Sequence, residues 1–385
     1  MKTNLKKLLY SGVTLMSLGV LAACSSTSSS TTTSSSAATS QTSVATTSNN
    51  STSSDSSSSS IDWSALPTTE VTLSNDGLKI TEGGTYILTG STTAGVTVET
   101  DANVRIILAG AEISSSDTAA INVINADNVE LEIKDGTTNT VKDSSNHTDT
   151  NIEGAIHVEA DLTITGNGSL TVEGNFQDGI VSTDDLVIDA GNITVTAVDD
   201  GIRGKDSLTI NGGTITVTAG GDGIKSTNDT DTTKGYTTIT GGEITVKAGD
   251  DGIKAETALT IDGGTITVSE SAEALEGTNI TINGGTLDVY GSDDAINAAS
   301  TTSSDIFIKV TGGDLKVAVG SGDTDAFDAN GDIYISGGTI AVTAPTSAFD
   351  FDGTAELTGG TVTVNGEQIT QITATGPGAG GHGGW

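Results

Sequence analysis

The stretch Val198-Asp-Asp-Gly-Ile-Arg-Gly-Lys-Asp-Ser-Leu-Thr-Ile-Asn-Gly-Gly-Thr-Ile-Thr-Val217 contains the pattern that decides the fold. Apolar residues alternate with polar ones at Leu208–Ile210 and again at Ile215–Val217, and a shorter stretch carries the single apolar residue Ile202. Such alternation predicts short β-strands with one buried face, and the Gly and Asn residues between them predict turns. One unit therefore contains three short strands.

The same unit recurs along the chain. Asp251-Gly-Ile-Lys-Ala-Glu-Thr-Ala-Leu-Thr-Ile-Asp-Gly-Gly-Thr-Ile-Thr-Val268 repeats it, and the second glycine of each Gly-Gly pair, or its counterpart, falls at positions 191, 213, 242, 264, 285, 313, 338 and 360. Four of these seven intervals are 21 or 22 residues long, and weaker copies precede them near positions 84, 110, 136 and 168. The longer intervals contain polar insertions such as Thr227–Lys234 and Ala299–Ser304.

Three short strands at a fixed period predict a parallel β-helix, in which each coil buries its Ile, Val and Leu side chains against neighbouring coils. A left-handed hexapeptide helix would repeat after about 18 residues, and a nine-residue calcium roll would show Gly-Gly-x-Gly-x-Asp. Neither pattern is present. We predict an all-β protein, a right-handed parallel β-helix of about 12 coils of roughly 22 residues each.

Composition narrows the possible functions. The 385 residues include 15 Lys and Arg against 50 Asp and Glu, a net charge of −35. This excess of acid argues against nucleic-acid binding, because phosphate recognition needs a basic surface. Five Phe, five Tyr and two Trp supply little aromatic bulk for an ordinary layered core, whereas 50 Gly with only three Pro suit a solenoid with many turns.

The N-terminus has the pattern of an export signal. Basic residues in Met1–Lys7 precede an apolar run over Leu8–Ala23 that is too short and too polar to span a membrane. The run ends in Leu21-Ala22-Ala23-Cys24, which resembles the lipobox of bacterial lipoproteins. That resemblance implies cleavage before Cys24 and acylation of its thiol, and an acylated protein on the extracellular face of the membrane, held there by its lipid anchor alone. The alternative is an ordinary signal peptide with a chance cysteine.

The chain therefore divides into four predicted parts. Residues 1–23 are the lipoprotein signal peptide, and residues 24–60 form a Ser/Thr-rich disordered stalk, since 28 of the 36 residues from Ser25 to Ser60 are Ser or Thr. Residues 61–368 form the β-helix, and the Gly-rich residues 369–385 form a loose tail. We expect a monomer.

Carboxylates occupy one register position just before the third strand of most units. They are Asp178, Asp199/Asp200, Asp222, Asp250/Asp251, Glu273, Asp293/Asp294 and Asp325. Equivalent residues of successive coils stack about 4.8 Å apart, and two carboxylates about 5 Å apart repel by roughly 3 kcal/mol at an effective dielectric of about 20. Raised pKa values, adjacent cations or a bound metal would relieve the repulsion. Clustered oxygen ligands without His or Cys favour Ca²⁺. The alternative is that each Asp only forms a solvated turn.

A column of cations follows the Asp-Gly-Ile motif directly, at Arg203, Lys225 and Lys254. Farther along the chain the same position changes to Glu276, Asn297, Asp328 and Asp350. We expect the lysines to be exposed, and two interpretations stay open. The cations either offset the carboxylates or, together with calcium, bind the carboxylates of uronic acids in a polysaccharide.

The lipobox, the stalk, Gly83-Gly-Thr-Tyr-Ile-Leu-Thr-Gly90 and the repeated motifs resemble a family of Gram-positive surface proteins described as carbohydrate-binding domain-containing. The resemblance covers residues 61–368 and implies a pectate-lyase-like β-helix that binds calcium and pectin-like or cellulose-like polysaccharide. Carried over by motif, it implies the calcium ligands Asp199, Asp200, Asp222, Asp250, Asp251, Asp293 and Asp294. The chain departs from the motif at Gly221 and at Ala272-Glu273.

Three functions follow as hypotheses. The first is a non-catalytic polysaccharide-binding lipoprotein, with Arg203, Lys225 and Lys254 at the binding site. The second is a calcium-dependent polysaccharide lyase in which one of these three cations takes the C5 proton, which would require a lowered pKa. The third is an adhesin or spacer whose repeats only supply length.

Overall fold

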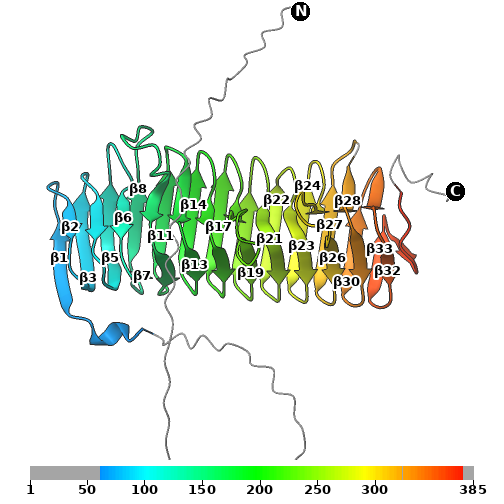
Figure 1. Ribbon diagram of the computed structural model, residues 1–385, viewed down its shortest axis with the longest axis horizontal. Coiled ribbons are helices and arrows are strands. Elements are labelled where there is room, and N and C mark those ends of the chain that lie inside the picture. Colours follow the sequence, from blue (N-terminus) through cyan, green and yellow to red (C-terminus); the bar gives the residue numbers. More distant parts are fainter. Residues whose placement is uncertain (1–60, 323, 376–385) are drawn as a thin grey trace, which may run out of the picture. The chain divides into compact units, whose positions relative to one another are not determined.

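The computed structural model describes residues 61–322 and 324–375. The expected signal peptide over 1–23, Cys24, the expected stalk and the last ten residues lie outside the described residues. The described chain winds into a stack of coils, ordered from the blue N-terminal end to the red C-terminal end in Figure 1. The all-β, right-handed parallel β-helix predicted from the repeat is confirmed.

Each coil contributes strands to three parallel sheets. Sheet 1 consists of β1 (Thr68–Leu73), β3 (Gly84–Thr92), β5 (Val104–Ser114), β7 (Asn128–Ile133), β10 (Asp161–Thr165), β13 (Asp185–Ile188), β16 (Ser207–Ile210), β19 (Tyr236–Ile239), β21 (Ile253–Ile261), β23 (Leu275–Ile282), β26 (Phe307–Val310), β29 (Asp332–Ile335) and β32 (Ala355–Leu357). Strands β3 and β5 continue around a corner into sheet 2, and β21 and β23 begin in sheet 3.

Sheet 2 follows the Gly-Gly turn. Its remaining strands are β8 (Thr138–Lys142), β11 (Ser169–Gly174), β14 (Asn192–Ala197), β17 (Thr214–Ala219), β20 (Glu243–Lys247), β22 (Thr265–Glu270), β24 (Thr286–Gly291), β27 (Asp314–Val319), β30 (Thr339–Thr343), β33 (Thr361–Val364) and β34 (Glu367–Ile369). The turn requires glycine because Gly213, like its counterparts in later coils, has a left-handed φ of 94°.

Sheet 3 contains the short strands that carry the Asp-Gly-Ile motif and its counterparts. Besides the first parts of β21 and β23, it consists of β2 (Leu78–Ile80), β4 (Val96–Glu99), β6 (Ile121–Asn125), β9 (Gly154–Val158), β12 (Asp178–Ser182), β15 (Ile202–Gly204), β18 (Ile224–Ser226), β25 (Ile296–Ala298), β28 (Asp325–Ala329) and β31 (Ser347–Phe351). These twelve strands pair in one parallel series within the described residues, which matches the predicted number of coils.

The core is a set of stacked aliphatic columns. Ile202, Ile224 and Ile253 are fully buried one above another in sheet 3, and the Leu, Ile and Val positions of the other two sheets do the same. Phe327 and Phe349 continue the sheet 3 column near the C-terminal end and stack with ring centroids 5.2 Å apart. Since each coil contacts only its neighbours, the fold is built from nearest-neighbour interactions.

The C-terminal end of the stack differs from the repeat. Strand β34 pairs antiparallel with β33 through a tight turn in which Asn365 and Gly366 both have positive φ, and this hairpin covers part of the last exposed edge. The prediction that a loose tail begins at residue 369 is therefore wrong. Ile369 lies in β34, and the backbone N–H of Thr375 donates to the Phe349 carbonyl oxygen at 3.0 Å.

The N-terminal end begins with a short 3-10 helix, η1 (Trp63–Ala65), which precedes β1. The Asp62 carboxylate caps it by accepting from the Ser64 backbone N–H at 3.1 Å. Within the described residues, no helix combines the length and apolar character that a membrane crossing requires.

Candidate functional site

The repeated Asp-Gly-Ile motif lies at one edge of sheet 3. In the coil of β15, Ile202 enters the core, and the Asp200 side chain is buried just before the strand begins. The intervening Gly201 has to be glycine, because a Cβ there would lie 2.4 Å from the Gly223 carbonyl oxygen of the next coil. Successive backbones therefore approach closely at this edge and hold the acidic side chains in register.

We call these stacked acids the carboxylate ladder; its members are Asp178, Asp200, Asp222, Asp251, Glu273, Asp294 and Asp325. The backbone N–H of Asp222 donates to Asp200 Oδ1 at 2.9 Å, and that of Asp251 donates to Asp222 Oδ1 at 2.9 Å. In the same way, the backbone N–H of Asp200 donates to Asp178 Oδ1, and that of Asp325 donates to Asp294 Oδ1. Each such carboxylate thus joins its coil to the next through a charge-assisted hydrogen bond.

The second carboxylate oxygen of the first ladder members binds a cation. Lys225 Nζ lies 2.5 Å from Asp200 Oδ2 and 3.0 Å from Asp222 Oδ2. Lys254 Nζ lies 2.7 Å from Asp251 Oδ2 and also pairs with Glu276. Each lysine therefore bridges two carboxylates from different coils.

Arg203 binds Asp178, the first acid of the ladder, in the same way. Its guanidinium lies 2.8 Å from Asp178 Oδ2 and also pairs with Glu153, which belongs to a loop 50 residues earlier. Burial raises the pKa of Asp178 to about 6, although the charge of Arg203 opposes this rise. The Arg203 guanidinium thus joins the Asp178 carboxylate to Glu153, a residue of a loop that is distant in sequence from Arg203.

The three cations belong to the outward column of sheet 3, which we define as Arg203, Lys225, Lys254, Glu276, Asn297, Asp328 and Asp350. The expectation that the lysines are exposed is wrong: the side chains of Lys225 and Lys254 are 19% and 28% exposed. They lie against the ladder because its carboxylates bind them. Of the two interpretations of this column, the geometry supports charge compensation, and glycan binding by these cations stays a prediction.

Carboxylate partners also change the acid–base properties of the lysines. Burial alone would lower the pKa of Lys225, but the hydrogen bonds and charges of Asp200 and Asp222 outweigh it and raise this pKa above its usual value. The pKa of Lys254 is raised for the same reason by Asp251 and Glu276. Both amines therefore stay protonated and have no free electron pair for proton abstraction.

The C-terminal part of the ladder has no cation in the outward column. Burial and neighbouring carboxylates raise the pKa of Asp294 to about 6 and that of Asp328 to about 7. Burial, together with Asp251, raises the pKa of Glu273 to about 9 and that of Glu276 to about 7. Protonation takes over here the role that lysine and arginine have in the earlier coils.

The seven expected calcium ligands do not form one site. Asp222, Asp250 and Asp251 come together, with one carboxylate oxygen of each within 4.8 Å of the others. The Asp251 Oδ1 atom is buried and accepts from no N–H or hydroxyl group among the described residues, and the Asp251 carboxylate lies beside the carboxyl groups of Glu273 and Glu276. These two observations fit a cation bound by oxygen, with the exposed Asp250 at its open side.

The other four expected ligands are not members of this cluster and fall into two pairs. A Cβ at Gly221 would lie 2.5 Å from Asp199 Oδ1 and 2.8 Å from Asp200 Oδ1, so this glycine leaves room for both carboxylates. Asp293 and Asp294 adjoin the cation-free part of the ladder. Only the cluster at Asp222 brings together three acidic side chains within the part of the chain that the structure describes.

Sequence reasoning missed the loop before β9, which supplies Glu153. His147 fixes this loop: its ring stacks on Phe176 with centroids 4.3 Å apart, and its Nε2 lies 3.0 Å from Asp143 Oδ2. The long insertion between β8 and β9 was the signal available in the sequence. The repeat spacing alone, however, does not reveal that Glu153 of this insertion pairs with Arg203. The loop extends the ladder's charge network backward by one coil.

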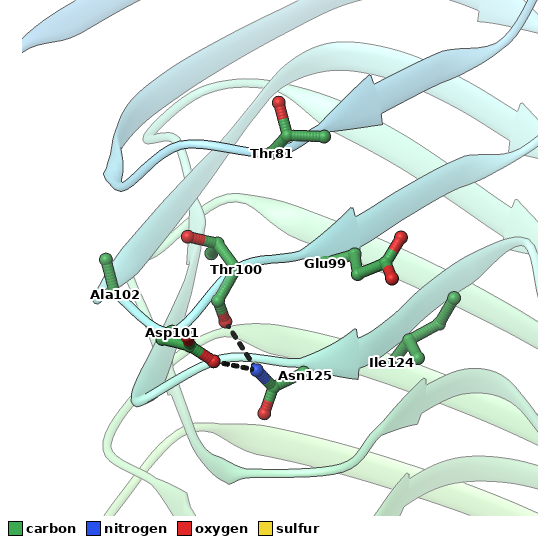
Figure 2. Close-up of a pocket in the computed structure, with 7 residues that line it drawn as sticks. All are labelled: Thr81, Glu99, Thr100, Asp101, Ala102, Ile124 and Asn125. Carbon is green, nitrogen blue, oxygen red and sulfur yellow. Dashed lines mark hydrogen bonds between the residues drawn. The ribbon is translucent and has the colours of Figure 1, made fainter.

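Figure 2 shows a cavity of about 700 Å³ at the corner where β4 and β6 lead toward sheet 1. Asn125 donates to the Thr100 carbonyl oxygen and to the Asp101 carboxylate, and Glu99 pairs with Lys79 at 2.8 Å. Three of the five polar side chains that line this cavity, those of Glu99, Asp101 and Asn125, thus already have a partner. The half-exposed Ile124 adds one apolar contact surface.

Comparisons with known proteins agree with this architecture. The chain is 33% identical over 135 residues to a carbohydrate-binding domain-containing protein of Acetivibrio thermocellus, a match that covers 33% of this chain and 47% of the relative, about half of its length. It is also similar to a solved structure described as the polysaccharide lyase-like protein from C. thermocellum, a gadolinium derivative. That match has a TM-score of 0.53 and 33% sequence identity, and it covers 55% of this chain and 96% of the other.

The family model described as carbohydrate-binding domain-containing protein matches residues 74–326. This range contains the first ten strands of sheet 3, the three cations and all seven expected calcium ligands. Since the match covers well over half of the sequence, the chain belongs to the carbohydrate-binding domain-containing protein family.

Proposed function

We propose that this protein binds polysaccharide without catalysing its cleavage. Family membership supports polysaccharide as the partner. The observation that carries the non-catalytic role is the geometry of the three cations. Arg203, Lys225 and Lys254 are each held by two carboxylates, so none is available as the base that a lyase needs.

We further propose that calcium binds at Asp222, Asp250 and Asp251. The proximity of their carboxylate oxygens and the buried Asp251 Oδ1, which accepts from no described N–H or hydroxyl group, support this site. The structural neighbour is described as a gadolinium derivative, and gadolinium, like calcium, is a hard cation that prefers oxygen ligands. Bound calcium would supply positive charge on this edge, to which the carboxylates of a pectin-like glycan could bind.

The proposed location is the extracellular face of the membrane, with Cys24 acylated. The lipobox-like Leu21-Ala22-Ala23-Cys24 and the Ser/Thr-rich residues that follow support this location. A labelled fatty acid incorporated by the wild-type protein, and not by a Cys24→Ala variant, tests the anchor. Equal labelling of both proteins would contradict it.

The central experiment incubates the purified protein with cellulose and with polygalacturonate, each with calcium or with a chelator. We expect retention on at least one polysaccharide and no unsaturated product in the ultraviolet. Such product would establish the lyase, for which the description of the structural neighbour is the supporting observation. A protein that binds neither polysaccharide would be a spacer.

A further inference from the structure

A groove crosses the corner between sheet 3 and sheet 1 near the middle of the stack. Two insertions form its walls: residues 227–235 between β18 and β19, and residues 299–306 between β25 and β26. The two coils between them have no insertion, because β21 and β23 run continuously around the corner. The walls are three coils apart, which corresponds to about 14 Å at the usual strand spacing.

Two adjoining cavities occupy this groove, with volumes of about 330 Å³ and 280 Å³. Both are lined by Glu256 and Thr278 of the floor and by Thr302 of the second wall, so they form one continuous hollow. The first cavity also extends to Asn228 and Asp229 of the opposite wall. A hollow of this width, open along its length, suits a single extended polymer chain rather than a folded protein surface.

Apart from two lysines that are paired with acids, the polar groups of the groove are acidic or uncharged. Asp229 and Glu256 are exposed, and neither carboxylate forms a hydrogen bond or ion pair with another described residue. Two lysines belong to the groove, and both are already paired: Lys254 with Asp251 and Glu276, and Lys234 of the first wall with Asp206. A polyanion would therefore be repelled, whereas the hydroxyl groups of a neutral sugar could donate to both free carboxylates.

One aromatic ring lies at the foot of the first wall. Tyr236, the first residue of β19, is 38% exposed and lines the larger cavity. The apolar face of such a ring packs against the C–H groups of a pyranose, while its hydroxyl remains available for hydrogen bonding. The groove thus combines an aromatic surface with free hydrogen-bond acceptors.

From this combination we propose that the groove between residues 227–235 and 299–306 is a binding site for a neutral, hydroxyl-rich polysaccharide, with Tyr236 and Glu256 as its main contacts. The proposal rests on the proposed polysaccharide-binding function and adds to it a location and a ligand class. The site is separate from the calcium cluster, whose acids do not line it.

The experiment measures the affinity of the purified protein for hydroxyethylcellulose, a neutral probe, and for polygalacturonate, an acidic probe, by affinity electrophoresis. Tyr236→Ala should weaken neutral binding by about tenfold, as removal of a central aromatic contact does. Tyr290→Ala is the matched control, because Tyr290 has the same exposure of 38% but lies on β24 in sheet 2. Its effect should stay within about twofold, as for an ordinary surface substitution.

Glu256→Gln provides a second, nearly isosteric variant that keeps the test valid if Tyr236→Ala does not fold. It should weaken neutral binding and leave polygalacturonate binding equal or stronger, because one repulsive charge is lost. Equal effects of the two tyrosine variants would contradict the proposal that the groove is the binding site, and so would wild-type binding to polygalacturonate alone. Neither result would contradict the proposed function. Failure of the wild-type protein to bind any polysaccharide would contradict the proposed function itself.

Discussion

The two halves of the carboxylate ladder have the same backbone geometry but opposite means of neutralisation. From Asp178 to Asp251 the outward column supplies Arg203, Lys225 and Lys254, and each bridges two carboxylates. From Glu273 onward the column supplies Glu276, Asn297, Asp328 and Asp350 and no cation, and the highest acid pKa values are found here, about 9 for Glu273 and about 7 for Glu276 and Asp328. The charge state of a stacked acid therefore depends on the residues that the outward column supplies in its own coil and in the next one.

The difference has an energetic reason. Two carboxylates about 5 Å apart repel by roughly 3 kcal/mol at an effective dielectric of about 20, so a ladder of ionised acids cannot persist without compensation. Ion pairs compensate in the first half, and bound protons do so in the second. The first solution requires a pH above the pKa values of the acids and below those of the cations, whereas the second fails as pH rises.

Loss of a bridging cation should have the largest effect. Lys225→Met removes the partner of both Asp200 and Asp222, and breaking such a largely buried pair costs about 3–5 kcal/mol. We expect a markedly lower unfolding midpoint in guanidinium chloride. Lys316→Met is the control, because Lys316 is 74% exposed beside Asp288 and should change stability by about 0–1 kcal/mol. Similar midpoints for the two variants would show that the bridges do not stabilise the first half.

Calcium should give the next largest effect, at the boundary between the two halves. If the ion binds Asp222, Asp250 and Asp251, calcium at about 100 times its dissociation constant should stabilise the fold by about 2.7 kcal/mol. The melting temperature should rise with calcium and fall again with a chelator. Asp250→Asn should abolish most of the rise while leaving the Lys225 and Lys254 bridges intact. Identical melting curves with calcium and chelator would contradict the metal site.

Introducing a lysine into the outward column of the second half should stabilise its acids as the cations do in the first half. Asn297 lies in register between Glu276 and Asp328, so Asn297→Lys would place an ammonium group beside both acids. We expect a gain of about 1.5 kcal/mol at pH 7, typical of a hydrogen bond to a charged group. Asn297→Met separates the charge from added side-chain length. An equal gain from both variants would show that packing, not charge, limits this region.

The smallest effect should come from pH. The pKa of Asp328 is raised from 3.8 to about 7 in the folded protein, so the folded state binds the proton more tightly than the unfolded state does. The resulting stability is complete below about pH 4 and is lost as pH rises through about 7. Asp328→Asn should therefore stabilise the protein by about 1 kcal/mol at pH 8, after allowance for solvent screening, and hardly at all at pH 4. A gain independent of pH would contradict the assignment, and melting curves at both pH values measure it.

The sequence alone was sufficient for the architecture. Period-two alternation, the Gly-Gly turn and the constant interval determined the three strands, the coil length and the register, because every coil repeats the same local interactions. It also identified the ladder and the outward column, since a fixed repeat places equivalent residues in one row. The short third strand with its single Ile was recognisable because a core column needs only one apolar residue per coil.

Only the tertiary structure showed which partners the residues of the carboxylate ladder and of the outward column have. The sequence predicted exposed lysines, yet Lys225 and Lys254 lie against acids of two coils, and Arg203 reaches Glu153, 50 residues earlier. The groove likewise arises from two insertions about 70 residues apart that the winding of the chain brings to the same corner. Local patterns determine how each coil folds, but the charges and hollows lie between coils, where insertion lengths and side-chain reach decide which groups meet.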